Sequence, residues 1–253
     1  MNELRPNKIG VIILLVLASA LIVGANMWKT SLRVRKVEVC GNRLVEANEV
    51  IQLVQVRLGE LLSAADLTEI QHNVLSHYYV KDALVERDLP GTLRVTVTER
   101  SPIAIVSRTE TVYLDEDGVV LPRTVSRNLY DLPVISGIPG SVPMRLGSHL
   151  GLDDVTEALG ILTALKFMSP ELYHTISEIQ LRNGGDIVLY SADGGVPIIF
   201  GRGGIASKLV RLETFWNTVV HDRGSQALQY VDLRYEDQVV ARWSDAKSGV
   251  NQL

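Results

Sequence analysis

The strongest constraint on the fold is an apolar segment near the N-terminus. Residues 9–27, from Ile9 to Met27, contain no ionisable side chain. In a helix that rises about 1.5 Å per residue, this segment is long enough to cross the roughly 30 Å hydrocarbon layer of a membrane. The sequence therefore predicts a transmembrane helix over residues 9–28 and a short cytoplasmic tail over residues 1–8. Trp28 follows the segment, where an aromatic ring favours the membrane interface.

A cleavable signal peptide is the alternative interpretation of this segment. Ala18, Ser19 and Ala20 resemble the small-residue cleavage site of such peptides. The apolar run continues through Leu21 to Val23, however, and exceeds the usual signal core of about 7 to 15 residues. Its length favours an uncleaved anchor.

Basic residues flank the predicted anchor on both sides. Arg5 and Lys8 precede it, and a larger basic group follows it at Lys29, Arg33, Arg35 and Lys36. The positive-inside rule alone would place the bulk of the chain in the cytoplasm. Part of the second group belongs to a predicted strand, so the charge bias alone leaves the orientation open.

Composition limits the classes of function. The chain has 253 residues and a net charge of −4, which allows two small domains and gives no positive field for nucleic acid. Its one cysteine, Cys40, excludes an intramolecular disulfide and any metal site with several cysteines. Cys40 is expected to be a small buried apolar residue.

The residues after the anchor predict a small domain with the order βααββ. The first strand covers residues 33–40, and a helix runs from Glu46 to about Gly59. A second helix follows the capping pattern from Ser63 to Asp66, and strands are predicted at 80–87 and 93–98. Between Val34 and Thr98 the order resembles a POTRA domain, which we place at residues 32–100. This resemblance implies protein contacts; an unrelated small α+β domain is the alternative.

The remaining chain predicts a second domain, rich in strands, over residues 101–243, followed by a C-terminal tail over 244–253. A hairpin is expected at 111–121 around Asp117-Gly118, and a helix after the capping pattern from Asp154 to Glu157. Strands are expected at 176–181, 187–191 and 196–200, then a helix over 205–219, then strands at 228–235 and 238–243. The expected fold class is α+β, with an antiparallel sheet in this second domain.

Three motifs suggest chemistry but have simpler explanations. Residues 201–206 fit G-x-G-x-x-A, yet a dinucleotide site needs several βα units around a parallel sheet. Residues 244–247 fit S-x-x-K but lie in a polar tail without the accompanying motifs of penicillin-binding enzymes. The acidic triplet at 115–117 lacks the other oxygen ligands of a calcium loop. The sequence thus predicts no catalytic residue, metal ligand or cofactor, and no small-molecule substrate.

Four stretches resemble the FtsQ/DivIB family of bacterial division proteins. They are Tyr230–Tyr235, Val239–Trp243, Val56–Gly59 and Lys208–Leu212. The resemblance implies a non-enzymatic, single-pass protein of the bacterial inner membrane, with the bulk of the chain extracytoplasmic at the division septum. It also implies binding of FtsB- and FtsL-like coiled-coil proteins, control of septal cell-wall synthesis, and contacts of other divisome proteins with the POTRA domain.

The same resemblance indicates which residues bind the partner. In the family, the last strand of the second domain receives a strand from FtsB, which an open sheet edge allows. Tyr235 and Trp243 match the aromatic residues of that hairpin, and Val239, Val240, Ala241 and Arg242 would form the edge. Arg202 is a candidate contact for an acidic group. The alternative function is a POTRA-type scaffold for envelope assembly or secretion.

Overall fold

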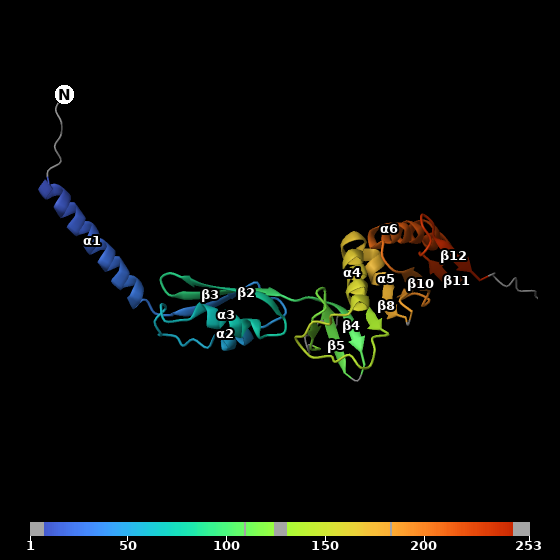
Figure 1. Cartoon of the computed structure of the whole chain (residues 1–253), viewed down its shortest axis with the longest axis horizontal. Coiled ribbons are helices and arrows are strands. Elements are labelled where there is room, and N and C mark those ends of the chain that lie inside the picture. Colours follow the sequence, from blue (N-terminus) through green and yellow to red (C-terminus); the bar gives the residue numbers. More distant parts are fainter. Residues whose placement is uncertain (1–7, 109, 124–130, 183, 245–253) are drawn as a thin grey trace, which may run out of the picture. The chain divides into compact units, whose positions relative to one another are not determined.

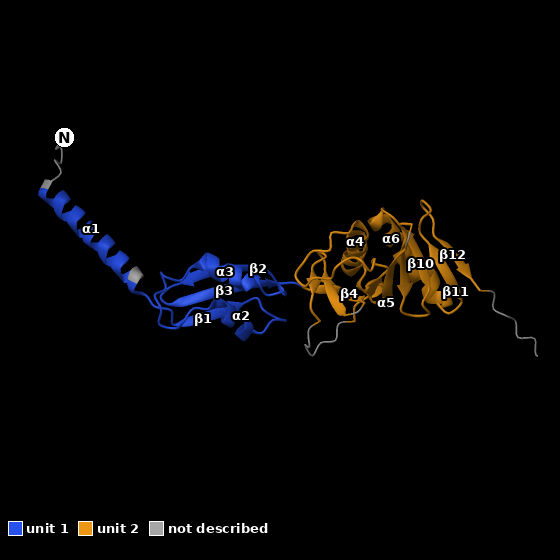
Figure 2. Ribbon diagram, turned by 60° about the horizontal axis from the view of Figure 1, so that its bottom comes forward, with its two compact units in different colours: residues 1–100 blue, residues 101–253 orange. Residues whose placement is uncertain are grey.

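The computed structural model describes residues 8–108, 110–123, 131–182 and 184–244. The chain divides into two compact units, Met1–Arg100 and Ser101–Leu253, which Figure 2 shows in different colours. The expected tails, 1–8 and 244–253, lie almost entirely outside the described residues.

Helix α1 (Lys8–Ser31) is the predicted apolar helix. Its segment Ile9–Trp28 has a mean hydropathy of 2.6, and none of it is buried within the protein. In Figure 1 the helix is a single straight rod with no other element against its length. An exposed apolar helix of this length is consistent with a single-pass membrane anchor.

The remainder of the first unit has the predicted βααββ order. Its elements are β1 (Lys36–Cys40), α2 (Ala47–Val54), α3 (Leu67–Leu75), β2 (Val80–Asp88) and β3 (Thr92–Glu99). The sheet order is β1-β3-β2, with β1 parallel and β2 antiparallel to β3. Val50 and Val74 of the helices are fully buried, as are Leu93 and Val95 of β3. One helical layer therefore covers one face of a small mixed sheet.

Three local details of this unit differ from the prediction. Helix α2 ends at Val54, before Gly59, because Gln55 adopts a left-handed conformation with φ 54°. The N-cap of α3 is Asp66 and not Ser63: its carboxylate accepts from the amides of Thr68 and Glu69. Cys40 is only partly buried.

The second unit is built on a nine-stranded sheet with the order β12-β11-β10-β9-β8-β7-β4-β5-β6. Its strands are β4 (Pro102–Ser107), β5 (Thr111–Asp115), β6 (Val120–Leu121), β7 (Val134–Ser136), β8 (Ile176–Leu181), β9 (Ile187–Ser191), β10 (Pro197–Gly201), β11 (Leu228–Asp232) and β12 (Val240–Trp243). Its helices are α4 (Asp153–Met168), α5 (Pro170–Thr175), α6 (Ile205–Phe215), the π-helix η1 (Trp216–Val220) and α7 (His221–Arg223). The predicted α+β class is confirmed.

The sheet of the second unit is mixed and not purely antiparallel. The pairs β4–β7, β7–β8 and β10–β11 are parallel, and the other neighbouring pairs are antiparallel. Helices α4 and α5 lie between β7 and β8 in the chain, and α6 to α7 lie between β10 and β11. A helical crossover returns the chain in the same direction, whereas a short hairpin reverses it. The two crossovers therefore account for two of the parallel pairs.

Two predicted polar features have structural roles in this unit. Asp115 is buried and accepts from the amides of Asp117 and Val119, at 3.1 and 2.8 Å, so it closes the hairpin turn. Helix α4 begins after Leu152 without a side-chain cap, in contrast to the predicted capping pattern. The carboxylate of Glu157, expected to complete that pattern, instead contacts the turn after β10.

Candidate functional site

Strand β12 forms one end of the nine-stranded sheet. It pairs antiparallel with β11, in a register that places Val231 opposite Ala241 and Asp232 opposite Val240. Within the described part of the chain, no other strand pairs with it. Figure 1 shows β12 at the outer margin of the second unit. A strand at a sheet end leaves a row of backbone donors and acceptors available to another chain.

The register indicates which backbone groups of β12 face outward. Ser244 donates its amide to the carbonyl of Ala227, next to β11, at 2.7 Å. Because successive residues of a strand alternate in direction, Val240 and Arg242 share this inward direction. The one register shift lies in β11, between Leu228 and Tyr230, and does not interrupt the alternation in β12. Ala241 and Trp243 therefore direct their amides and carbonyls away from the sheet.

The side chains of β12 divide between the two faces of the sheet. Val239, Ala241 and Trp243 pack against the core beneath the helices. The alternating positions, Val240 and Arg242, consequently lie on the opposite face. Arg242 is exposed, and no ion pair joins it to another described residue. Strand β12 thus presents an apolar side chain, Val240, and a cationic one, Arg242, on the face of the sheet that points away from this core.

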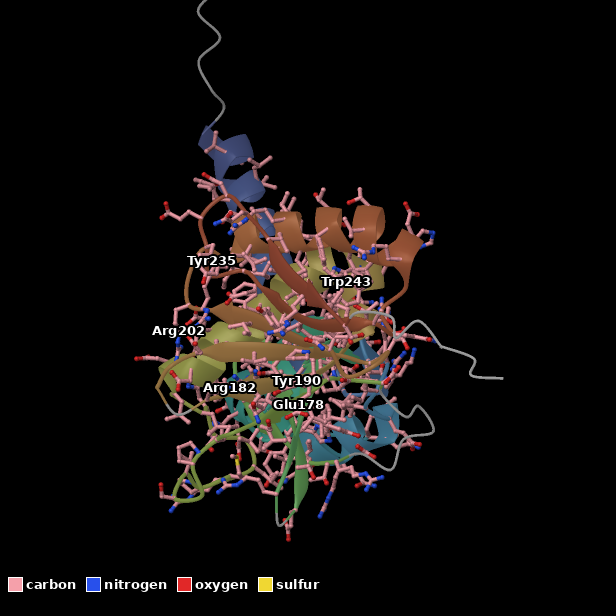
Figure 3. The ribbon with its side chains drawn as sticks, turned by 90° about the vertical axis from the view of Figure 1, so that its right-hand side faces the viewer. Glu178, Arg182, Tyr190, Arg202, Tyr235 and Trp243 are labelled. Carbon is pink, nitrogen blue, oxygen red and sulfur yellow. The ribbon has the colours of Figure 1, made fainter. Side chains whose placement is uncertain are left out.

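Trp243 is held by a contact with a residue outside the sheet. The guanidinium carbon of Arg223, in α7, lies 4.3 Å from the centroid of the Trp243 ring. This is the distance range of a cation–π interaction. Figure 3 shows Trp243 on the β12 side of the unit, away from Arg202. The contact fixes the indole ring at the end of the edge strand.

Tyr235 lies in the loop that joins β11 to β12. The prediction extended the strand to Tyr235, but β11 ends at Asp232, and the tyrosine side chain is 50% exposed. Arg211 of α6 donates from Nη1 to the carbonyls of Tyr235 and Gln238, at 2.6 and 2.9 Å. This loop is therefore tied to α6, with the phenol ring left accessible beside the edge. Val239 also lies outside the strand, immediately before it.

A charged pair anchors the start of the same loop. Arg234 donates from Nη2 to Oδ2 of Asp232, at 2.7 Å, and from Nη1 to Asp186, at 3.0 Å. Burial raises the pKa of Asp232, but the hydrogen bonds from Arg234 outweigh it and bring the net pKa below its usual value. The same hydrogen bond raises the pKa of Arg234 above its usual value. Both groups are charged at neutral pH, and the pair stiffens the exit from β11.

Arg202 already has partners within the second unit. Its guanidinium donates to Glu157 at 2.7 Å, to Asp154 and to the carbonyl of Gly185. The hydrogen bonds with Glu157 and then Asp154 raise the pKa of Arg202. Arg202 is thus committed to two carboxylates of α4. In Figure 3 it lies on the same side of the view as Tyr235, whereas Trp243 lies on the other side.

The glycine-rich turn at 201–206 is likewise occupied. The amide of Gly203 donates to Oε1 of Glu157 at 2.6 Å, so a carboxylate takes the place that a phosphate would need. Lys208 donates from Nζ to the carbonyls of Phe200 and Arg202, each at 2.8 Å, and its burial lowers its pKa. This turn is a structural connection between β10 and α6.

Sequence reasoning assigned no role to Arg211, Arg223 or Lys208, although Lys208 and Arg211 lie in one of the stretches that resemble the family. Arg211 reaches residues 24 and 27 positions away, and Arg223 reaches Trp243 across the helix–sheet junction. No local pattern in the chain predicts such contacts. The amphipathic spacing of 205–219 predicts the helix but not which of its polar residues bind the β11–β12 loop.

Other polar clusters do not form a reactive centre among the described residues. A cavity of about 470 Å³ is lined by His174, Asp193, Trp216, His221 and Ser225, among others. The hydroxyl of Ser225 donates to Asp193 and not to a histidine. The described residues also contain no group of three or more potential metal ligands. These side chains therefore offer no activated nucleophile.

An apolar helix suited to a single-pass anchor, a βααββ domain and a β-rich domain with an open edge together define an anchored POTRA-containing protein. Residues 32–100 match the family described as "POTRA domain, FtsQ-type", and residues 104–234 match "Cell division protein FtsQ/DivIB, C-terminal". The chain belongs to the FtsQ/DivIB family of cell division proteins, which are not enzymes.

Individual relatives agree with this family. The chain is 30% identical over 213 residues to "Cell division protein FtsQ" of Geobacter sp. (strain M21), which covers 84% of this chain and 77% of the relative. It is 29% identical over 215 residues to the protein of the same name from Geotalea daltonii, covering 84% and 76%. For the protein of that name from Rhodothermus marinus, the identity is 30% over 224 residues, covering 85% and 80%.

Proposed function

We propose that this division protein is a septal scaffold that receives a β-strand from an FtsB-like partner at β12, together with an FtsL-like protein, and so helps control septal cell-wall synthesis. The observation that carries the proposal is the open side of β12, where Ala241 and Trp243 direct backbone groups outward. A partner strand would form hydrogen bonds with these outward groups, as β11 does with the inward groups of β12. Backbone hydrogen bonds then supply affinity, and alternate side chains supply specificity.

The side chains beside the edge indicate what the partner strand should carry. A residue directly across from another on neighbouring strands has its Cβ about 4.5 to 5.5 Å away. The open face of β12 presents Val240 and exposed Arg242. The partner strand should therefore place an acidic side chain opposite Arg242 and an apolar one opposite Val240.

Two aromatic residues extend the surface beyond the backbone. Trp243 lies partly buried at one end of β12, and half-exposed Tyr235 lies in the loop at the other end. Aromatic residues dominate many protein interfaces, where truncation of one such residue costs about 2 kcal/mol or more. Arg202, with its carboxylate partners inside the unit, would support this surface from a distance.

The placement of the chain in the cell forms part of the proposal. We place residues 1–8 in the cytoplasm, the helix over 9–28 in the inner membrane, and the domains over 32–100 and 101–243 outside the cytoplasm at the septum, with 244–253 as a tail. The POTRA sheet also has open edges, at β1 and β2, which would suit contacts with other divisome proteins. A fluorescent fusion imaged in dividing cells tests the septal position; diffuse envelope labelling would favour an assembly scaffold instead.

A proline on β12 tests strand addition directly. Ala241→Pro removes an outward amide without removing a bond to β11, and such a position tolerates proline at a sheet edge. The full-length variant in detergent should lose most of its affinity for the partner in a co-purification assay. Ala241→Val adds similar volume but keeps the amide, so it should retain the partner. Equal retention by both variants would exclude pairing at this edge.

A proline at Val240 would be a poorer test. The amide of Val240 points toward β11, so its loss would weaken the pairing that holds β12 in the sheet. A thermal unfolding curve of each variant separates the two effects. Ala241→Pro should unfold close to the temperature of Ala241→Val, whereas Val240→Pro should unfold earlier.

A further inference from the structure

A second polar surface lies at the junction of the anchor and the first domain. Residues 29–36 contain Lys29, Arg33, Arg35 and Lys36 and no acidic residue. This basic run follows the anchor, on the side that holds the folded domains. This basic run belongs to the first unit, whereas the edge at β12 belongs to the second, so partner binding at β12 does not account for it.

The backbone of this junction is fixed by pairing within the first unit. The amide of Val34 donates to the carbonyl of Glu60, and the amide of Gly59 donates to the carbonyl of Val34, each at 2.8 Å. Leu32 and Val34 are buried together with Leu62. Because residues alternate along this extended segment, Arg33 and Arg35 point outward and are exposed. The two guanidinium groups are thus presented by an ordered segment.

The junction also borders an open cavity. Its volume is about 600 Å³, and its lining residues are Trp28, Ser31, Leu32, Arg33, Val34, Arg35 and Gly59. Nη1 of Arg33 donates to the carbonyl of Gly59 at 2.7 Å, which fixes one side of the cavity. The lining therefore combines an indole ring, a hydroxyl group and two cationic side chains.

The two arginines have no carboxylate partner among the described residues. Lys36 pairs with Glu38 at 3.0 Å, and Glu38 also contacts Arg94. Neither Arg33 nor Arg35 takes part in an ion pair with a residue that the structure describes. Glu60, the exposed residue that follows Gly59 of the cavity lining, also forms no ion pair with a described residue. Two positive charges are therefore available to an external anion.

The chain itself sets the depth of this site relative to a membrane. The candidate span ends at Trp28, α1 ends at Ser31, and Arg33 follows two residues later. An extended chain advances at most about 3.6 Å per residue, so Arg33 stays within about 7 Å of the helix end. Trp28 occupies the interfacial position that aromatic rings favour. The cavity consequently lies at the level of lipid phosphates.

We propose that this cavity binds the phosphate group of an anionic phospholipid. Arg33 and Arg35 would supply charge-assisted hydrogen bonds, which a planar guanidinium can make to two phosphate oxygens at once. The hydroxyl of Ser31 donates to the carbonyl of Trp28 at 2.9 Å and leaves phosphate binding to the two guanidinium groups. Trp28 would lie beside the glycerol region. The basic run after the anchor would then serve to recognise lipid.

Native mass spectrometry of the full-length chain in neutral detergent tests this site. Phosphatidylglycerol and phosphatidylcholine are added in turn, and the lipid retained on the protein is measured. The wild type should retain phosphatidylglycerol in preference to phosphatidylcholine. Each basic residue near a membrane surface contributes about a fivefold factor in affinity, so Arg33→Gln with Arg35→Gln should lower phosphatidylglycerol binding about twenty-fivefold.

Matched variants separate a built site from general attraction. Arg43→Gln removes one exposed arginine beyond the far end of β1 and should bind phosphatidylglycerol like the wild type. Arg33→Lys with Arg35→Lys keeps both charges but loses the two-oxygen contacts, so it should bind less phosphatidylglycerol than the wild type and more than the double glutamine variant. No preference in the wild type, or an equal loss in Arg43→Gln, would overturn the proposal.

A competition experiment identifies the source of the phosphate. Inorganic phosphate is added to the protein after it has bound phosphatidylglycerol. If the site recognises a lipid, the phosphatidylglycerol should remain bound at millimolar phosphate, because the acyl chains add affinity. Full displacement at that level would assign the site to free phosphate and contradict the lipid proposal.

Discussion

Arg223 covers the indole ring of Trp243, with its guanidinium carbon 4.3 Å from the ring centroid. The two residues join α7 to the last residue of the edge strand. A cation–π contact at an exposed site stabilises by about 0.5 to 1 kcal/mol. The contact orients the aromatic ring without burying it fully, and it links the position of Trp243 to the end of the helical segment.

Loss of this contact should have a small and measurable effect. Arg223→Gln is expected to lower the free energy of unfolding by about 0.5 to 1 kcal/mol in urea titrations of the full-length protein. Arg242→Gln, on the same edge but without an ion pair among the described residues, should change it by less than about 0.5 kcal/mol. A larger loss in Arg242→Gln than in Arg223→Gln would contradict this assignment.

Arg211 should control the loop that carries Tyr235. Arg211→Met removes the donor to the carbonyls of Tyr235 and Gln238 but keeps the aliphatic part of the side chain. Hydrogen exchange of residues 233–239 should become faster, and affinity for the strand-donating partner should fall about tenfold, the equivalent of about 1.4 kcal/mol.

The control for this experiment is Arg145→Met, at an exposed position outside this loop. It should leave both readouts unchanged. Faster exchange with undiminished partner binding would show that the loop is not part of the interface.

The Asp232–Arg234 pair predicts a dependence of stability on pH. The folded-state pKa of Asp232 is lowered, so the pair stabilises the protein above the ordinary carboxylate pKa of about 3.9, and this stability is lost as pH falls through the folded pKa. Asp232→Asn should cost about 1.5 to 3 kcal/mol at pH 7, the range for hydrogen bonds to charged groups. The difference in the free energy of unfolding between Asp232→Asn and the wild type should shrink in acid. Urea unfolding at pH 7 and in acid measures it.

The glycine that directly follows β7 should not tolerate a side chain. A Cβ on Gly137 would lie 2.0 Å from the backbone oxygen of Leu181, and φ there is 83°. Gly137→Ala should therefore destabilise the second unit by more than about 2 kcal/mol. Gly140→Ala, where the nearest atom would be 3.5 Å away, should stay within about 0.5 kcal/mol. Similar melting temperatures for the two variants would refute the close approach.

Much of the fold follows from local patterns in the chain. The apolar run of 9–28 predicts α1, and the alternation in residues 93–98 predicts β3, because these patterns reflect which face each residue buries. The parallel pair β4–β7 has no such signal. Its strands are separated by the hairpin of β5 and β6, and their pairing depends on how these pieces pack together.

The candidate site could be predicted only in part. The final residues of the chain indicate a strand, and the family resemblance indicates that its edge binds a partner. The end of β11 at Asp232 could not be predicted, because residues 228–235 are compatible with a longer strand. Arg234 folds back on Asp232, and Arg211 fixes the carbonyls of the loop. The contact of Arg211 spans 24 residues, and together the two contacts place Tyr235 outside the sheet.

The place of β12 in the chain has a consequence for assembly during synthesis. Domains emerge from the ribosome and fold from the N-terminus onward, so α1 and the first unit exist before β11 has a strand to pair with. The outward groups of Ala241 and Trp243 become available only after the preceding strands are in place. Incomplete or truncated copies would thus reach the membrane without the means to recruit the strand-donating partner.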